Sequence, residues 1–238
     1  MTEPPPERRL GRLTSPEAAA AQPVVLLVPL GSTEQHGPHL PLDTDTRIAV
    51  ALCEAAAGSG GRRLVSPPVC YGASGEHAGF AGTLSIGTEA LCRLLVELVR
   101  SADGFGATVL VSAHGGNAAA LRAAVRILAA EGRAVAAWSP RIAGGDAHAG
   151  ATETSIMLVV EPGAVRLDRI EAGARDGLEQ LWPVLRSGGI LAVSPSGVLG
   201  DPTAASSRHG LELMEQLVSD LDQAIAVLER AISATMAP

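Results

Sequence analysis

The chain has 238 residues, of which 47% are hydrophobic and only 2% aromatic, and its formal net charge is −7. This length can bury the core of one large α/β domain, which Ala, Val, Leu and Ile would have to fill. The negative charge argues against a nucleic-acid partner, which needs clustered Lys and Arg, and no apolar run approaches the ~18 residues that span a bilayer.

The first part of the chain predicts a flexible end and then a single domain over residues 10–238. Residues 1–9 contain three successive prolines and lack the apolar stretch of a signal peptide. Residues 10–21 predict a short helix with Ser15 as its N-cap and Pro16 in its first turn. An odd number of cysteines without close spacing favours a reduced, cytoplasmic protein over a disulfide framework: Cys53, Cys70 and Cys92.

The most informative stretch follows the apolar run of residues 23–30, which predicts a strand buried on both faces. Glu34 and His36 come just after it, and side chains two apart in extended backbone point to the same side. Asp45 follows beyond turn-forming Gly and Pro residues. Carboxylate oxygen and imidazole nitrogen hold catalytic divalent metals, although a polar loop with capping carboxylates would carry the same residues.

The rest of the chain predicts an alternation of helices and strands. Helices are expected over 46–57, 88–102 and 118–130, and strands over 64–69, 107–112 and 133–138. Residues 153–160 fit either a helix or a strand, whereas 211–231 fit an amphipathic helix that packs in the core or between subunits. We therefore expect a three-layer α/β/α fold with a mainly parallel central sheet.

Two further groups of candidate ligands lie downstream. His114 follows directly after the predicted strand 107–112, and open α/β sheets assemble their sites at that end of the strands. His148 and Glu153 lie in a glycine-rich stretch over residues 144–155. Three separate groups of His and carboxylate residues, two of them at strand ends, strengthen the hypothesis of a metal site.

Together these stretches resemble the creatininase (creatinine amidohydrolase) family over roughly residues 22–215. The resemblance is carried by Gly31-Ser-Thr-Glu-Gln-His-Gly37 with Asp45, His114-Gly-Gly-Asn117, His148-Ala-Gly-Ala-Thr-Glu-Thr-Ser155 and residues 75–85, where the family usually has proline in place of Ala81. Residues 43–47, 71–77, 145–148, 187–189 and 200–203 are similar to a branch that trims a modified precursor peptide. The resemblance implies a creatininase-like metallohydrolase domain.

The resemblance also implies a pocket for two divalent ions, and Zn, Fe or Mn would suit its mixed N/O ligands. Glu34 and His114 would hold one ion and His36 the other, with Asp45 between them. Asp43 competes with Asp45, but the spacing from His36 favours Asp45.

One position departs from creatininase itself, which has an acidic ligand two places after the equivalent of His114. Gly116 occupies that place here. The resemblance therefore implies that Glu153 closes the second metal site and takes part in catalysis.

Paired ions roughly 3.5–4 Å apart would lower the pKa of a water and polarise a carbonyl oxygen, which are the needs of amide hydrolysis. His148 is expected to donate a proton or stabilise the oxyanion, unless it only orders its loop. Glu76, His77 and Asn117 are implied substrate contacts. His39 and His77 are equally well explained as hydrogen-bonded loop histidines.

Three functions are consistent with the sequence. The resemblance implies a metal-dependent peptidase that releases a C-terminal dipeptide from a modified precursor peptide. Another amidohydrolase, acting on a cyclic amide or a formamide, is the alternative; a phosphate-bearing substrate is disfavoured, because the motif loops offer only Arg47 and Arg141. A non-catalytic metal-binding scaffold is the third. The family's hexamers imply a homo-oligomer.

Overall fold

The computed structural model describes residues 7–22 and 24–236. A four-stranded parallel sheet with the order β2-β1-β3-β4 forms its centre: β1 (Val25–Leu30), β2 (Arg63–Val65), β3 (Ala107–Ser112) and β4 (Val135–Trp138). The helices are α1 (Ser15–Ala21), α2 (Thr44–Gly58), α3 (Gly87–Ser101), α4 (Ala118–Ala130), α5 (Ala151–Val160), α6 (Leu178–Gly188) and α7 (Ser207–Met236).

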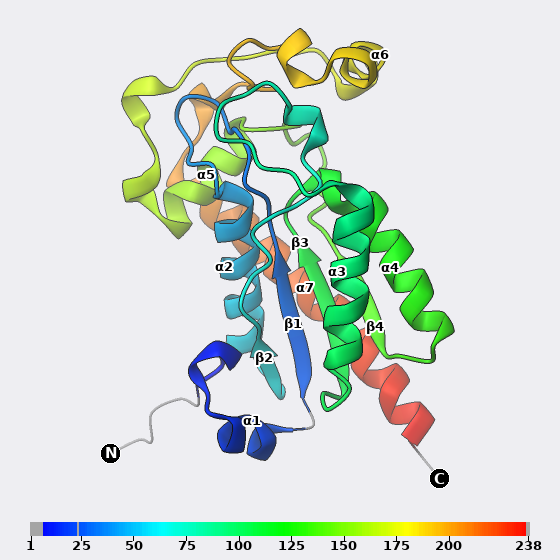
Figure 1. Cartoon of the computed structure of the whole chain (residues 1–238). Coiled ribbons are helices and arrows are strands. Elements are labelled where there is room, and N and C mark those ends of the chain that lie inside the picture. The colour runs from blue at the N-terminus through cyan, green and yellow to red at the C-terminus, as the bar shows by residue number, and fades with distance from the viewer. Residues whose placement is uncertain (1–6, 23, 237–238) are drawn as a thin grey trace.

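Helices cover both faces of the sheet (Figure 1). The apolar cluster on one face joins the sheet to α2, α5 and α7, and the cluster on the other face joins it to α3 and α4. Strand β1 serves both clusters, because Val25 and Leu27 point to the first and Leu26 and Val28 to the second. The predicted strand buried on both faces and the three-layer α/β/α architecture are therefore confirmed.

Most predicted elements lie within a few residues of their expected bounds. Residues 153–160, which fitted helix or strand, belong to α5. Strand β2 is an edge strand and stops at Val65, just before the prolines at 67 and 68, because proline cannot donate to a sheet ladder. The apolar stripe of α7 packs in the core through Leu217, Leu221 and Ile225.

Two local predictions need correction or addition. Thr14, not Ser15, precedes the first turn of α1, and its backbone N–H donates to the Glu17 carboxylate at 2.7 Å, which forms a capping box. Helix α6 was not predicted at all. Its apolar residues Leu181, Trp182 and Leu185 do follow helical spacing, but Pro183 lies inside the helix.

Three further expectations concern the start of the chain, the cysteines and membrane-spanning segments. The predicted flexible stretch 1–9 lies largely outside them, but the Arg8 carbonyl accepts a hydrogen bond from Val65 N–H at 2.8 Å. The cysteines form no disulfide in the described part of the chain. No helix within residues 7–22 and 24–236 is both long and apolar enough to cross a membrane.

Candidate metal centre

The carboxyl ends of β1 and β3 deliver the candidate ligands to one edge of the sheet. Glu34 and His36 follow β1, and His114 follows β3. The chain turns at Gly37, which has a positive φ of 65°, and Glu34 N–H donates to Leu42 O at 2.9 Å. This turn brings Asp45, in the first turn of α2, back to Glu34. The loop before α5 and its first turn add His148 and Glu153.

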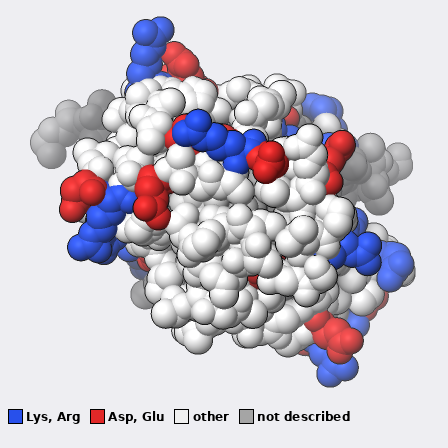
Figure 2. Space-filling view, turned by 90° about the horizontal axis from the view of Figure 1, so that it is seen from above, with Lys and Arg blue, Asp and Glu red and all other residues white. Residues whose placement is uncertain are grey.

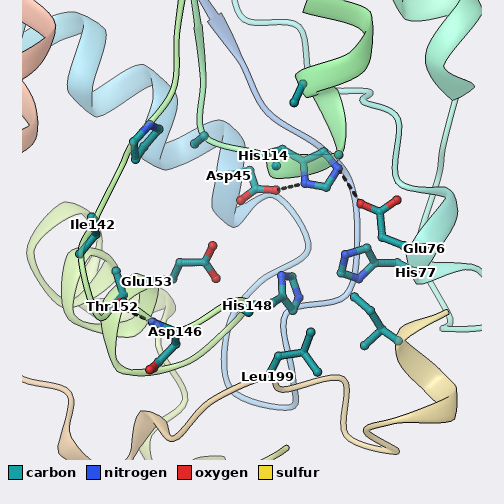
Figure 3. A pocket seen from close by; sticks show the side chains of 18 of the residues that line it. Asp45, Glu76, His77, His114, Ile142, Asp146, His148, Thr152, Glu153 and Leu199 are labelled. Atoms are coloured by element: carbon teal, nitrogen blue, oxygen red, sulfur yellow. Dashed lines mark hydrogen bonds and ion pairs between the residues drawn. The ribbon is translucent and has the colours of Figure 1, made fainter. Parts of the chain in front are cut away.

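The candidate ligand atoms form three overlapping groups: Glu34, Asp45 and His114; His36, His148 and Glu153; and Glu34, His77 and His148. Asp45 lies between His114 and His36, and Figure 3 shows Asp45, His114, His148 and Glu153 around one space. In the first group, His114 Nδ1 lies 3.1 Å from Glu34 Oε1 and 3.4 Å from Asp45 Oδ2. His36 Nε2, in the second group, lies 3.3 Å from Asp45 Oδ1 and 4.0 Å from Glu153 Oε2. Atoms that share a metal at about 2.0–2.2 Å stand at such separations. The residues expected as metal ligands are thus brought together.

Backbone carbonyls orient three of the histidines toward this centre. His36 Nδ1–H donates to Glu34 O at 3.1 Å, His114 Nε2–H to Ala73 O at 3.2 Å, and His148 Nε2–H to Gln35 O at 2.8 Å. Each ring, once neutral, therefore presents an unprotonated nitrogen to the cluster. Metal-binding histidines almost always donate their outer N–H in this way.

Glu34 supplies the test of whether a cation fits here. Its side chain is completely buried, and neither carboxylate oxygen has a hydrogen-bond partner among the described residues, although His77 Nε2 and His114 Nδ1 each lie 3.1 Å from Oε1. A buried carboxylate without hydrogen bonds carries a large desolvation cost. A divalent cation among Glu34, Asp45 and His114 would remove that cost, so the donor set fits a metal.

The carboxylates give the cluster a negative potential that shifts its histidines. Burial alone lowers the pKa of His36, but the neighbouring carboxylates, Asp45 first among them, raise it to about 9. Burial opposes a charge on His114 too, yet Asp45 and Glu34 raise its pKa well above the usual value. Burial raises the pKa of Glu153 to about 7. A divalent cation would displace the protons that this potential attracts.

A pocket of about 790 Å³ opens above the cluster. Its floor carries six of the expected site residues: Asp45, Glu76, His77, His114, His148 and Glu153. Apolar side chains and two arginines line its outer part: Ile142, Ile156, Trp182, Leu185, Ile190, Leu199, Arg122 and Arg186. Most of the face of the molecule on the α6 side is uncharged (Figure 2).

Three further polar residues do not line the pocket: Asp43, His39 and Asn117. Asp43 is half exposed and accepts a hydrogen bond from Arg47 Nε at 2.7 Å, so Asp45 alone reaches the cluster. His39 binds Thr154 Oγ1 at 2.8 Å, as a hydrogen-bonded loop histidine would.

We expected Asn117 to contact the substrate, but its side chain binds the backbone and Ser112 instead. Its Oδ1 accepts a hydrogen bond from Ala73 N at 2.9 Å, and its Nδ2 donates to Gly31 O at 3.0 Å and Ser112 Oγ at 3.2 Å. The side chain is fully buried and does not line the pocket. Asn117 therefore joins three loops at the sheet edge.

The surroundings of Gly116 leave no room for an acidic side chain at this position. A Cβ at this position would lie 2.4 Å from each of three atoms: Ala73 O, Glu76 Oε1 and His114 Nε2. Figure 3 shows Glu76 and Asp45 on opposite sides of the His114 ring. The space next to residue 116 is thus filled, and the carboxylate near His36 comes from Glu153 in α5.

Sequence reasoning missed Gln35 and the outer pocket. Gln35 lies within the motif that carries Glu34 and His36, yet an amide gives no metal signal. Trp182 and Arg186 stand four residues apart in a helix that was not predicted, and Arg122 is one of two arginines in α4. No spacing rule would have joined these residues to the site.

Comparison with known proteins decides the family. A sequence model described as creatinine amidohydrolase matches residues 11–225. The chain belongs to the creatininase family. As a member of this family it is a hydrolase that acts on C–N bonds.

Individual relatives agree with the family. A mycofactocin precursor peptide peptidase of Mycobacterium ulcerans is 53% identical over 227 residues, which cover 91% of this chain and 90% of that protein. A manganese form of creatininase has a TM-score of 0.75 at 25% identity and covers 92% of this chain and 98% of its own. A mutant creatininase of Zn-Zn type has a TM-score of 0.75 at 26% identity, with coverages of 93% and 98%. Creatininases thus carry Mn or Zn.

Proposed function

We propose that this chain is a peptidase that releases a C-terminal dipeptide from a modified mycofactocin precursor peptide with the help of two divalent ions. The observation that carries the proposal is that Asp45 lies 3.4 Å from His114 Nδ1 and 3.3 Å from His36 Nε2, between two groups of candidate ligands beside a pocket. The similarity to a mycofactocin precursor peptide peptidase supports the choice of substrate.

Five side chains would hold the ions. Glu34 and His114 would bind one ion, His36 and Glu153 the other, and Asp45 would bridge them. When bound, Zn, Fe or Mn would supply Lewis-acid polarisation of the amide carbonyl and of the attacking water.

In our proposal His148 moves the proton. Its Nε2–H is engaged by Gln35 O, so Nδ1 faces the cluster and lies 4.0 Å from Glu34 Oε1. Burial lowers the pKa of His148 well below its usual value, and His36 adds to the effect. A neutral ring can accept a proton at Nδ1 from the attacking water and return it to the leaving nitrogen. Glu153 lies beside it and shares this catalytic role.

The size and lining of the pocket support a peptide rather than a small cyclic amide. About 790 Å³ lies within the range of pockets that enclose drug-sized ligands, well above the need of a single small ring. Arg122 and Arg186 form no ion pair or hydrogen bond within the described part of the chain. Both are available to a carboxylate or to carbonyl groups of the peptide, next to the aromatic face of Trp182.

We also propose polar substrate contacts, a cellular location and an oligomeric state. Glu76 and His77 line the pocket and are the proposed polar contacts for the peptide. We place the enzyme in the cytoplasm as a homo-oligomer, a hexamer by family resemblance.

The test is hydrolysis of the modified C-terminal peptide by metal-reconstituted protein, followed by mass spectrometry. We expect a released dipeptide, which Glu34→Gln abolishes and the exposed Glu97→Gln control preserves. Creatinine and a formamide serve as competing substrates. Protein that holds metal and cleaves one of these but not the peptide would contradict the peptide substrate, and protein that binds no metal would contradict the centre itself.

A further inference from the structure

The side chain of Gln35 is buried and makes three close polar contacts with different segments. Its Oε1 lies 2.9 Å from Gly37 N, and its Nε2 lies 3.1 Å from Gly197 O and 2.9 Å from His77 Nδ1. The amide therefore joins the loop after β1 to the loops that carry His77 and Gly197.

The backbone partners fix which way the amide points. A backbone N–H can only donate, so the atom next to Gly37 N must be the amide oxygen. A carbonyl can only accept, so the atom next to Gly197 O must be the amide nitrogen. Nε2 has two hydrogens: one goes to Gly197 O, and the other is directed to His77 Nδ1. The His77 Nδ1 atom is therefore an acceptor without a hydrogen.

His148 does not compete for these hydrogens. Its Nε2 also lies 3.1 Å from Gln35 Nε2, but it already donates its own hydrogen to Gln35 O at 2.8 Å. Two donors face each other there, and neither gives the other a hydrogen. The hydrogen bond between Gln35 and His77 therefore still runs from Gln35 Nε2 to His77 Nδ1.

With Nδ1 as an acceptor, His77 carries its hydrogen on Nε2, which lies 3.1 Å from Glu34 Oε1. His36, His114 and His148 each have a carbonyl at the outer nitrogen and present a lone pair to the centre. His77 alone has a donor at its outer nitrogen, and so presents a hydrogen. A histidine that binds metal through Nε2 needs an acceptor for its Nδ1–H, and Gln35 supplies the opposite.

We propose that Gln35 fixes the hydrogen of His77 on Nε2, so that in the metal-loaded protein His77 donates it to Glu34, which lies 3.1 Å away, and is not a metal ligand itself. This inference rests on the metal centre proposed above, and it is independent of the substrate. Glu34 Oε1 would be held between the His77 hydrogen and the metal shared with His114 and Asp45. His77 and Gln35 are positioning residues in this scheme.

The loop around Gly197 is shaped to the amide. Gly197 has a positive φ of 82°, and a Cβ there would lie 1.9 Å from Gln35 Oε1. Both the backbone angle and the close approach require glycine. The amide thus has little freedom to turn over and exchange its two ends.

Zinc binding to His77 variants tests the role of the side chain. His77→Gln keeps an N–H that can reach Glu34, whereas His77→Leu removes it. We expect unchanged zinc stoichiometry in both, a Kd within about 3-fold of the parent for His77→Gln, and a Kd raised about 10- to 100-fold for His77→Leu. The exposed His209→Gln is the matched control. Loss of one zinc equivalent in both variants would make His77 a ligand, and an unchanged Kd in His77→Leu would remove its role.

The position of the hydrogen can be read directly by long-range ¹H–¹⁵N NMR of ¹⁵N-histidine-labelled, zinc-loaded protein. We expect the Nε2–H form for His77, and the Nδ1–H form in Gln35→Glu, whose carboxylate would accept a hydrogen there. The exposed Gln216→Glu is the control. An Nδ1–H form in the parent would overturn the proposal even if Gln35→Glu does not fold. Zinc-loaded protein with the expected hydrogen but no peptide cleavage would overturn only the proposed function.

Discussion

Asp45 is the carboxylate that lies between His114 and His36. Its Oδ2 accepts a hydrogen bond from Ser32 Oγ at 2.6 Å and faces His114, while its Oδ1 faces His36. Both oxygens thus have a fixed direction, which a bridging ligand needs. Asp43, two residues earlier, points to Arg47 instead.

This difference predicts opposite results for two conservative substitutions. Asp45→Asn removes a charge shared by both proposed ion sites, so we expect loss of both metals and a fall in hydrolysis of at least about 100-fold. Asp43→Asn should leave metal content and rate unchanged, because Asp43 lies outside the cluster. Metal analysis of the purified proteins, with rates on the same samples, measures both. Retention of two metals in Asp45→Asn would contradict the bridge.

The raised pKa of His36 predicts a proton release. In metal-free protein this pKa is about 9, so the ring is charged near neutral pH and must lose its proton when metal binds. Zinc affinity should therefore rise from about pH 6 to about pH 9 and level off above that. Calorimetry in buffers of different ionisation enthalpy measures the released protons. An affinity that is independent of pH over this range would contradict the assignment of His36 as a ligand.

At the scale of residues, the sequence indicated which side chains meet but not how their hydrogens point. Glu34, His36 and His114 were predictable because they follow buried strands that end at one edge. The role of Gln35 was not, because its partners lie 42 and 162 residues further along the chain. Asn117 was misplaced for a similar reason, since its amide partners come from three separate loops.

At the scale of secondary-structure elements, helix α6 borders the pocket but does not touch the proposed metal ligands. Trp182, Leu185 and Arg186 line the pocket, whereas Val184 on the same helix is exposed and does not. We therefore expect Trp182 of this helix to contact the substrate, but not the peptide bond that is cleaved.

We expect Trp182→Ala to weaken substrate binding more than catalysis. Loss of an aromatic contact should raise KM for the peptide roughly 3- to 10-fold, with kcat within about 2-fold of the parent. Val184→Ala is the matched control and should change neither. Steady-state kinetics decide the matter, and a large fall in kcat at unchanged KM would place Trp182 in the reaction instead.

The elements that were predicted correctly are those with strong periodicity or a buried apolar run. Helix α6 is the exception: Leu181, Trp182 and Leu185 follow helical spacing, but Pro183 interrupts its sequence and Trp182 is exposed. The N-cap of α1 moved from Ser15 to Thr14, because the Glu17 carboxylate can close a capping box only with the residue three places earlier. Local sequence defined the strands better than it defined the helix that borders the pocket.

At the scale of the whole molecule, the centre joins elements from all parts of the fold. Its ligands follow β1 and β3 or lie in α2 and α5. Without a cation, buried carboxylates of these elements repel one another.

Metal removal should therefore destabilise the protein as a whole. A chelator is expected to lower Tm, by an amount that corresponds to about 4 kcal/mol when zinc had been present at 1,000 times its Kd. Differential scanning calorimetry measures the shift. The Asp45→Asn variant is the control and should not respond to the chelator; an equal response would show that the stabilising metal binds elsewhere.

The core under α7 predicts a different loss of stability. Leu221 is completely buried against the sheet, whereas Leu211 on the same helix is 53% exposed. Leu221→Ala should reduce the free energy of unfolding by about 2–5 kcal/mol, and Leu211→Ala by no more than about 0.5 kcal/mol. Urea unfolding of the zinc-loaded proteins measures both. Equal values would contradict the packing of α7.

The filled space beside Gly116 has a consequence for other members of the family. A side chain at this position would meet the Glu76 carboxylate, the Ala73 carbonyl and the His114 ring at once. Creatininase, by the resemblance described above, has its acidic ligand at the equivalent place. A side chain at position 116 therefore requires the neighbouring 73–76 segment to shift. We expect relatives with an acidic residue at this place to hold that segment in a different position.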